Sequence, residues 1–235
     1  MLCDIDIIYI VFIFRLLGEK IDRGGHMAFK ARVDSKSIAL LSIFSAMAAM
    51  LEIFPVVGIT DLKLVPEVPS FTIDWTGIPI FLIFLGFGII GAFFSIAIVG
   101  VAIGYRNPVG ALFKVLAESL TIIGALIGWI ICRKAKITGY KRIIVYLIPA
   151  ILLRAIGMYF GNIFLLQFFY SVPYEVALLQ STILVPWNAI QAIINLVAGG
   201  FFYYAIPQNL RVEAGIAGDE EIDIVQELTD EEIES

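Results

Sequence analysis

Three amide side chains recur at helical spacing in the last long apolar segment of the chain. Asn188, Gln191 and Asn195 follow Pro186-Trp187, and a rotation of about 100° per residue places the three within an arc of about 60° on one helix face. Hydrocarbon offers these amides no hydrogen-bond partner, so they must face other helices, a water-filled cavity or a ligand. Two interpretations stay open: a binding site, or hydrogen bonds that only hold helices together.

Ionisable residues also occur inside the apolar segments, where charges are rare and usually functional. Lys114 and Glu118 lie one turn apart, and Arg154 lies near the middle of the next segment, followed by Tyr159 and Asn162. These residues predict a polar site within a membrane. The alternative is structural: a Lys114–Glu118 pair, or a Glu118–Arg154 bridge between two helices.

The elements that position these residues follow from composition. The chain has 235 residues, of which 60% are hydrophobic and 16% charged, with a mean hydropathy of +0.95. Soluble domains have an apolar share nearer one half. We therefore predict an all-α polytopic protein that crosses the cell membrane several times, with the lipid bilayer as its surroundings and no nucleic-acid partner.

Six transmembrane helices are expected, taking about 20 residues as one span. The second and third share one stretch that Gly86, Gly88 and Gly91 divide, because glycine permits a hinge. The segments run over residues 35–54, the two parts of 78–103, 109–132, 143–170 and 184–206. A polar loop over 55–75 follows the first helix, and a second loop covers 171–182.

Orientation follows from the basic residues, which favour the cytoplasmic side. They cluster before the first helix and between the fourth and fifth helices: Lys30, Arg32, Lys36, Arg133, Lys134, Lys136, Lys141 and Arg142. With six spans both termini are cytoplasmic, and the loops over 55–75 and 171–182 face outward.

Three parts of the chain are predicted. Residues 1–34 form an N-terminal extension, disordered or partly untranslated, because translation is hypothesised to start at Met27. Residues 35–206 form the membrane domain. Residues 207–235 form a disordered cytoplasmic tail, in which ten acidic residues are opposed only by Arg211.

Several kinds of chemistry lack their components. No phosphate-binding P-loop motif occurs, and the G-x-G-x-x-G match over 86–91 has no acidic residue about 20 positions later. His26 is the only histidine, and the cysteines Cys3 and Cys132 are far apart, which favours neither a metal site nor a disulfide. We expect no enzyme activity and no cofactor.

Small residues in the first helix could allow another helix to approach closely. Ser42 and Ala46 are four residues apart, as are Ser45 and Ala49. This spacing predicts a partner-binding face. Packing within the protein is the equal alternative, since the fourth helix has the similar pair Gly124 and Gly128.

The stretch from Lys36 to Ile206 resembles the substrate-binding S components of energy-coupling factor (ECF) transporters, most closely the riboflavin-specific ones. The matching pieces are Ile38-Ala39-Leu40-Leu41-Ser42, Phe71-Thr72-Ile73-Asp74-Trp75-Thr76-Gly77-Ile78-Pro79, Pro108-Val109-Gly110 and Pro186-Trp187-Asn188. The resemblance implies a six-helix protein that captures a vitamin from outside and covers it with the first loop. It also implies docking, through the small-residue first helix, onto a transmembrane T subunit that carries two ATPases.

The substrate-binding residues then expected are the polar residues named above together with Asp74, Trp75 and Trp187. Two departures from the riboflavin-type pattern concern the substrate. Gln191 stands where those members have lysine, and Lys114 stands where they have asparagine. Riboflavin is the first expectation. A different vitamin-like metabolite, a non-transport scaffold subunit and a self-sufficient carrier are the alternatives.

Overall fold

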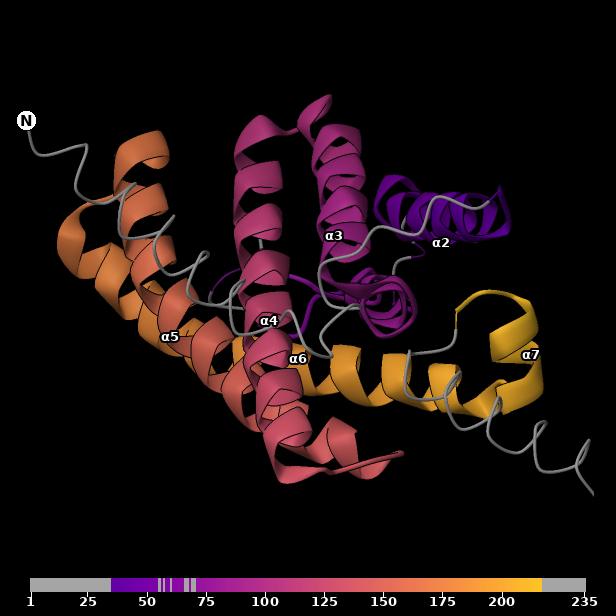
Figure 1. Cartoon of the computed structure of the whole chain (residues 1–235). Coiled ribbons are helices and arrows are strands. Elements are labelled where there is room, and N and C mark those ends of the chain that lie inside the picture. Colours follow the sequence, from indigo (N-terminus) through magenta and orange to yellow (C-terminus); the bar gives the residue numbers. More distant parts are fainter. Residues whose placement is uncertain are drawn as a thin grey trace, which may run out of the picture.

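The computed structural model describes residues 35–216 except 55, 57, 60, 66, 67, 69 and 70. Within this part, helices are joined by short connections and one small hairpin (Figure 1). The helices are α2 (Ser35–Ile53), α3 (Gly77–Gly104), α4 (Pro108–Ala135), α5 (Lys141–Tyr170), α6 (Tyr174–Ala205) and α7 (Gln208–Glu213). The hairpin pairs β1 (Asp61–Leu62) antiparallel with β2 (Ile73–Asp74). The hypothesised start at Met27 lies outside the described residues.

Five of these helices, α2 to α6, are long and apolar enough to cross a membrane. Large apolar side chains stay exposed along them, for example Phe160, Phe164 and Phe168 on α5. A continuous exposed apolar surface of this kind is typical of contact with lipid. The prediction of a multi-pass α-helical membrane protein is confirmed, and the side on which the termini lie stays a prediction.

The predicted break in the long apolar stretch is confirmed at Gly88. Its φ of 76° and ψ of −170° lie outside helical geometry, in a region that only glycine adopts readily. As a result α3 consists of two arms that meet at a sharp bend (Figure 1). Counted at this bend, the described chain has six apolar helical segments, but five helices are long enough to cross a membrane with α3 taken whole, and six separate spans stay a prediction.

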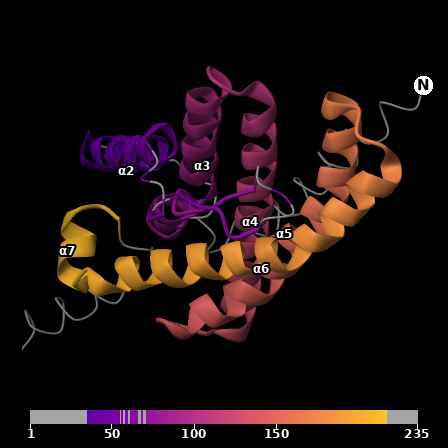
Figure 2. The same cartoon turned by 180° about the vertical axis from the view of Figure 1, so that it is seen from behind.

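The sixth helix begins at Tyr174, so the prediction of a loop over 171–182 is wrong. Only residues 171–173 connect α5 to α6, and α6 continues as one long helix, seen from behind in Figure 2. Pro173 precedes the first turn and Glu175 lies within it, where proline and negative charge are both favourable. Ala177 and Ser181 are fully buried, so packing keeps this polar stretch helical.

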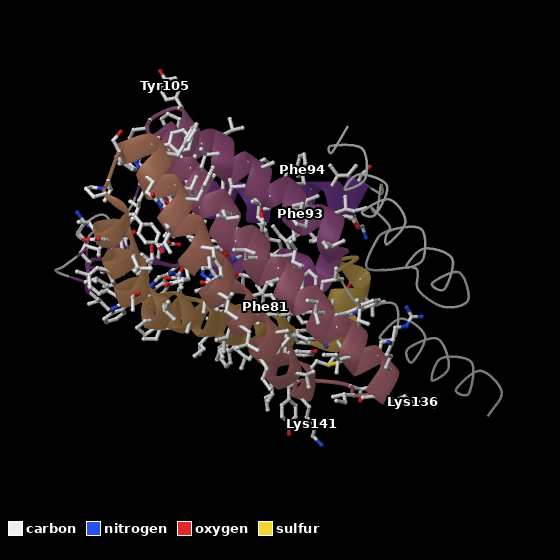
Figure 3. The ribbon with its side chains drawn as sticks, turned by 90° about the vertical axis from the view of Figure 1, so that its left-hand side faces the viewer. Phe81, Phe93, Phe94, Tyr105, Lys136 and Lys141 are labelled. Carbon is white, nitrogen blue, oxygen red and sulfur yellow. The ribbon has the colours of Figure 1, made fainter. Side chains whose placement is uncertain are left out.

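Close packing of α4 on α5 depends on glycine. A Cβ atom at Gly128 would lie 2.6 Å from the Cα of Tyr146, and one at Gly124 would overlap the α5 backbone. This pair therefore serves packing within the protein. Tyr146 is buried, and its ring meets those of Phe81 and Phe84 edge to face in the core; Figure 3 labels Phe81 at the centre of the molecule.

The packed structure continues past residue 206, into the segment that the sequence predicted to be disordered. After α7, Ile216 is 3% exposed and packs against Ile83 and Phe87 of α3. The Tyr203 hydroxyl donates a hydrogen bond of 3.1 Å to the Ile216 carbonyl. Residues 207–216 therefore pack with the helices, and the disordered tail stays a prediction for residues 217–235, which lie outside the described part of the chain.

Candidate functional site

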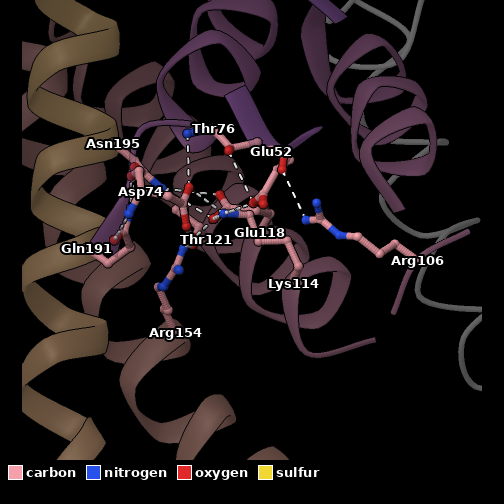
Figure 4. Close-up of polar contacts among 10 residues, drawn as sticks. All are labelled: Glu52, Asp74, Thr76, Arg106, Lys114, Glu118, Thr121, Arg154, Gln191 and Asn195. Carbon is pink, nitrogen blue, oxygen red and sulfur yellow. Dashed lines mark hydrogen bonds and ion pairs between the residues drawn. The ribbon is translucent and has the colours of Figure 1, made fainter. Parts of the chain in front are cut away.

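Lys114, in the second turn of α4, lies at the centre of a buried group of charges (Figure 4). Its ammonium lies 2.9 Å from Glu52 Oε1 and 3.8 Å from Glu118 Oε1, and it forms a closer ion pair with Asp74. The three carboxylates come from the last turn of α2, from α4 and from β2. One lysine with a side chain only 11% exposed thus joins elements that are distant in sequence.

Glu118 extends this group to α5 and α6. Arg154 Nη1 lies 3.0 Å from Glu118 Oε1 and donates a hydrogen bond of 2.8 Å to Thr121 Oγ1. Asn195 Nδ2 donates to Glu118 Oε2 at 3.2 Å. All four residues are buried. The Glu118–Arg154 bridge that the sequence allowed as a structural alternative is therefore present.

The Gln191 amide connects α6 to the first loop. Its Oε1 accepts a hydrogen bond of 3.2 Å from the Asp74 backbone N–H, and its Nε2 donates to the Asp74 carbonyl. Nε2 also donates to Asn195 Oδ1 at 3.0 Å. The side chain pairs with the backbone of β2 as a neighbouring strand would, which fixes the end of the loop against the helix.

We name Glu52, Asp74, Lys114, Glu118 and Arg154 the ionic cluster. Asp74 lies in the loop, outside the membrane-spanning helices. Burial alone would raise the pKa of its carboxyl, but the charge and hydrogen bond of Lys114, with the backbone N–H of Thr76, hold that pKa below its usual value. The carboxylate is therefore ionised at neutral pH, and the acidic and basic groups of the cluster largely pair with one another.

A second set of buried polar side chains lies outside the cluster, on α5 and α6, and we name it the polar row: Asn162, Ser181 and Asn188. Each is at most 3% exposed. Ser181 Oγ has no hydrogen-bond partner in the part of the chain that the structure describes. Among the described residues, Asn188 donates only to the Leu184 carbonyl of its own helix, at 3.0 Å. Asn162 likewise has no partner among the described residues. The polar row thus has hydrogen-bond donors and acceptors that are not paired with any described residue.

The first loop packs on the half of α6 that carries Ser181 and Asn188. Val65 and Val68 of the loop are buried against Leu184, and Phe71 and Trp187 pack around them. This apolar contact and the Gln191 hydrogen bonds together hold the loop on α6. The loop is therefore placed as a cover over the N-terminal half of that helix.

The other predicted residues are placed less centrally. Tyr159 is half-buried, and its ring meets Phe160 edge to face at 5.1 Å between centroids. Trp75, beside Asp74, is 41% exposed. Ser42 and Ala46 are exposed on α2, whereas Ser45 and Ala49 are buried; the latter pair faces the protein interior.

Sequence reasoning missed four residues that the structure brings to the cluster or the row: Glu52, Thr76, Thr121 and Ser181. Thr76 Oγ1 donates to Glu52 Oε1 at 3.2 Å, and the exposed Arg106 donates to the Glu52 carbonyl at 3.4 Å. An acid at the end of an apolar helix was the available signal for Glu52. Among the described residues, no group of His, Cys, Asp and Glu side chains could hold a metal ion.

Comparison with known proteins assigns no family. No family model matches the chain, and no curated protein does. Three chains of solved structures match. One of them is described as the crystal structure at 2.1 Å of the S-component for biotin from an ECF-type ABC transporter, with 14% identity and a TM-score of 0.46. The match covers 73% of this chain and 94% of that one. At this score the similarity decides neither family nor ligand.

Proposed function

We propose that this protein is the substrate-binding S component of an ECF-type transporter, and that it binds a vitamin, with riboflavin as the first candidate. The observation that carries the proposal is the polar row: three buried side chains whose hydrogen-bonding capacity the described residues leave unused, on α5 and on the half of α6 that the first loop covers. The ordered sequence motifs that resemble S components support the same conclusion.

The ligand is placed with its hydroxyl or carbonyl groups against Asn162, Ser181 and Asn188. Its flat part lies among apolar and aromatic side chains, with Tyr159 of α5 and Trp187 of α6 as candidates. Leaving one buried polar group unpaired costs about 1 to 3 kcal/mol. A ligand that satisfies the polar row would therefore gain both affinity and specificity.

The ionic cluster has a supporting role in this proposal. Its Asp74 carboxylate accepts a hydrogen bond from the Thr76 N–H, and Gln191 binds the Asp74 backbone, so that the end of the first loop is held in place. Gln191 and Asn195 therefore act on the ligand through the loop rather than by direct contact. Asn188 lies one turn away, and its Oδ1 has no partner in the described part of the chain. It is therefore the amide of the sequence trio that touches the ligand.

Energy for uptake would come from partner subunits, because the sequence has no P-loop. The proposed partners are a transmembrane T subunit and two ATPases. Ser42 and Ala46 lie on the exposed face of α2, where a partner helix could approach. Ser45 and Ala49 are buried and would act only by holding α2 against the rest of the protein.

A non-transport scaffold subunit is the second candidate. The observation that favours it is the mutual pairing of six predicted site residues: Asp74, Lys114, Glu118, Arg154, Gln191 and Asn195. Groups that satisfy one another need no ligand. This candidate predicts that the purified protein binds no small molecule.

The first experiment identifies the ligand directly. The protein is purified in detergent from cells grown on rich medium and denatured, and released small molecules are identified by absorbance and mass spectrometry. A flavin would confirm riboflavin, and biotin or another vitamin would retain the S-component assignment with a different substrate. No released molecule, together with no binding in a vitamin screen, would favour the scaffold.

The site itself is tested with Asn188→Ala in titrations with the identified vitamin. The dissociation constant should rise roughly 10-fold to 100-fold, the effect expected for one buried hydrogen-bonding group. Asn209→Ala is the matched control, because Asn209 is exposed on α7. Unchanged affinity in a folded Asn188→Ala protein would remove Asn188 from the site.

A further inference from the structure

The connection between α4 and α5 carries a cluster of bases with no acidic residue nearby in the sequence. No Asp or Glu occurs between Glu118 and Glu175, and five bases lie in the middle of this stretch, within residues 133–142. We name residues 133–142 the basic turn. Lys134, Lys136 and Lys141 are exposed, and none of the three has an ion-pair partner in the described part of the chain.

The backbone of the basic turn is held in a defined shape. Lys136 takes a left-handed conformation with φ of 54°, which ends α4. Arg142 Nε donates to the Ile137 carbonyl at 2.9 Å, and the Tyr204 hydroxyl of α6 donates to the Gly139 carbonyl at 3.0 Å. The lysine side chains therefore extend from a fixed base, so less backbone entropy is lost when they bind a partner.

Exposed apolar side chains border the basic turn on both helices. Ile131 of α4 is 45% exposed, and Ile144 and Ile148 of α5 are 61% and 64% exposed. Tyr140 within the turn is 69% exposed, and the Arg133 guanidinium lies 5.5 Å from the centre of the Trp129 ring. A boundary of apolar residues, aromatic residues and bases is typical of the level at which lipid headgroups begin.

We propose that the basic turn binds the headgroup phosphate of an anionic phospholipid. The ammonium groups of Lys134, Lys136 and Lys141 would surround the phosphate, and the lipid's acyl chains would run along Ile144 and Ile148. Clusters of Lys and Arg directly beside transmembrane helices bind anionic lipids in this way. A lipid fits the surface better than a soluble anion, because the bases continue directly into an exposed apolar face.

This lipid site is separate from the proposed vitamin site. Lys114 lies near the start of α4 and Lys136 just beyond its end, a separation of about 33 Å along the helix axis. Figure 3 places Lys136 and Lys141 at one end of the molecule and Tyr105 at the opposite end. The inference does not depend on the proposed function, and it can hold whichever vitamin binds.

The test compares lipid binding by the full chain and by a double variant, Lys136→Gln with Lys141→Gln. Each protein is titrated in neutral detergent with phosphatidylglycerol and, separately, with phosphatidylcholine, and bound lipids are counted by native mass spectrometry. The wild type should prefer phosphatidylglycerol. The double variant should bind it about 30-fold more weakly, as expected from the contribution of two lysines beside an anionic headgroup.

Lys63→Gln is the matched control, because Lys63 is exposed on the first loop and belongs to neither site; it should bind phosphatidylglycerol as the wild type does. Elution volume and unfolding temperature confirm that each variant is folded. Equal binding of the two lipids by the wild type, or unchanged binding by the folded double variant, would overturn the proposal. The titration is repeated with a chain that lacks residues 217–235. If only this shortened chain preferred phosphatidylglycerol, the lysines would bind the acidic tail in the full chain, and the proposal would be overturned.

Discussion

The side chain of Asn195 occupies the space that any side chain at Gly77 would need. A Cβ atom built at Gly77 would overlap the Asn195 amide, which itself is fully buried and bonded to Glu118. Gly77 begins α3, directly after the loop end that Gln191 holds. Because Gly77 has no side chain, α6 can pack closely enough for its amides to reach the ionic cluster.

Gly77→Ala should destabilise the protein by about 1 to 3 kcal/mol, the usual cost of overpacking a filled interior. The shift is measured as a lower unfolding midpoint in detergent. Gly104→Ala is the control, because a Cβ there would meet Ala111 at an ordinary 3.7 Å. A Gly77→Ala protein as stable as the wild type would show that Asn195 can move without cost.

Removing either partner of the Glu118–Arg154 pair should be costly, because it leaves a buried charge unpaired. Glu118→Gln and Arg154→Met are each expected to destabilise by about 3 to 5 kcal/mol. The double variant should lose less than the sum of the single losses, since both charges are then absent. Additive losses in denaturant unfolding would contradict the direct bridge at 3.0 Å.

The docking of the first loop should weaken in acid. The folded-state pKa of Asp74 is below its unfolded value. The ionised carboxylate therefore stabilises the docked loop fully above the unfolded pKa, and this stabilisation is lost as pH falls through the folded pKa. The loss should therefore begin as pH falls below the unfolded pKa and grow as pH falls further toward the folded pKa. Hydrogen exchange of the peptide over 71–76 measures it. Asp74→Asn should exchange faster at neutral pH and depend less on pH, and an identical pH profile in both proteins would count against this role.

The exposed face of α2 can be tested for partner binding with Ala46→Phe. Ala46 is exposed on α2, so the substitution should leave vitamin affinity and stability unchanged, yet prevent close approach of another helix. Co-purification with the proposed T subunit and ATPases should fall at least about 10-fold, which corresponds to a loss of about 1.4 kcal/mol of binding free energy. Ile156→Phe enlarges a different exposed apolar face, on α5, and should assemble normally. Normal assembly of the Ala46→Phe protein would refute the assignment of this face.

The sequence alone was sufficient for the membrane class, the approximate helices and the break in α3. Each rests on a local property: the length of an apolar run, or the freedom of a glycine such as Gly88. The start of α6 was missed for the complementary reason. The polar residues at the start of α6 are typical of a loop. The helix there is stabilised by the burial of Ala177 and Ser181, which depends on packing between helices and not on the local sequence.

Tertiary structure alone decided which predicted residues meet. The sequence placed Asn188, Gln191 and Asn195 on one face. Only the fold pairs Gln191 with the first loop and Asn195 with Glu118, and it leaves Asn188 Oδ1 without a partner among the described residues. The fold also buries Ser45 in the protein and leaves Ser42 exposed on the surface. Lipid and protein core are equally apolar, so a hydrophobic helix carries no signal for its rotation. That rotation is set by long-range packing, which determines which polar groups remain for a ligand.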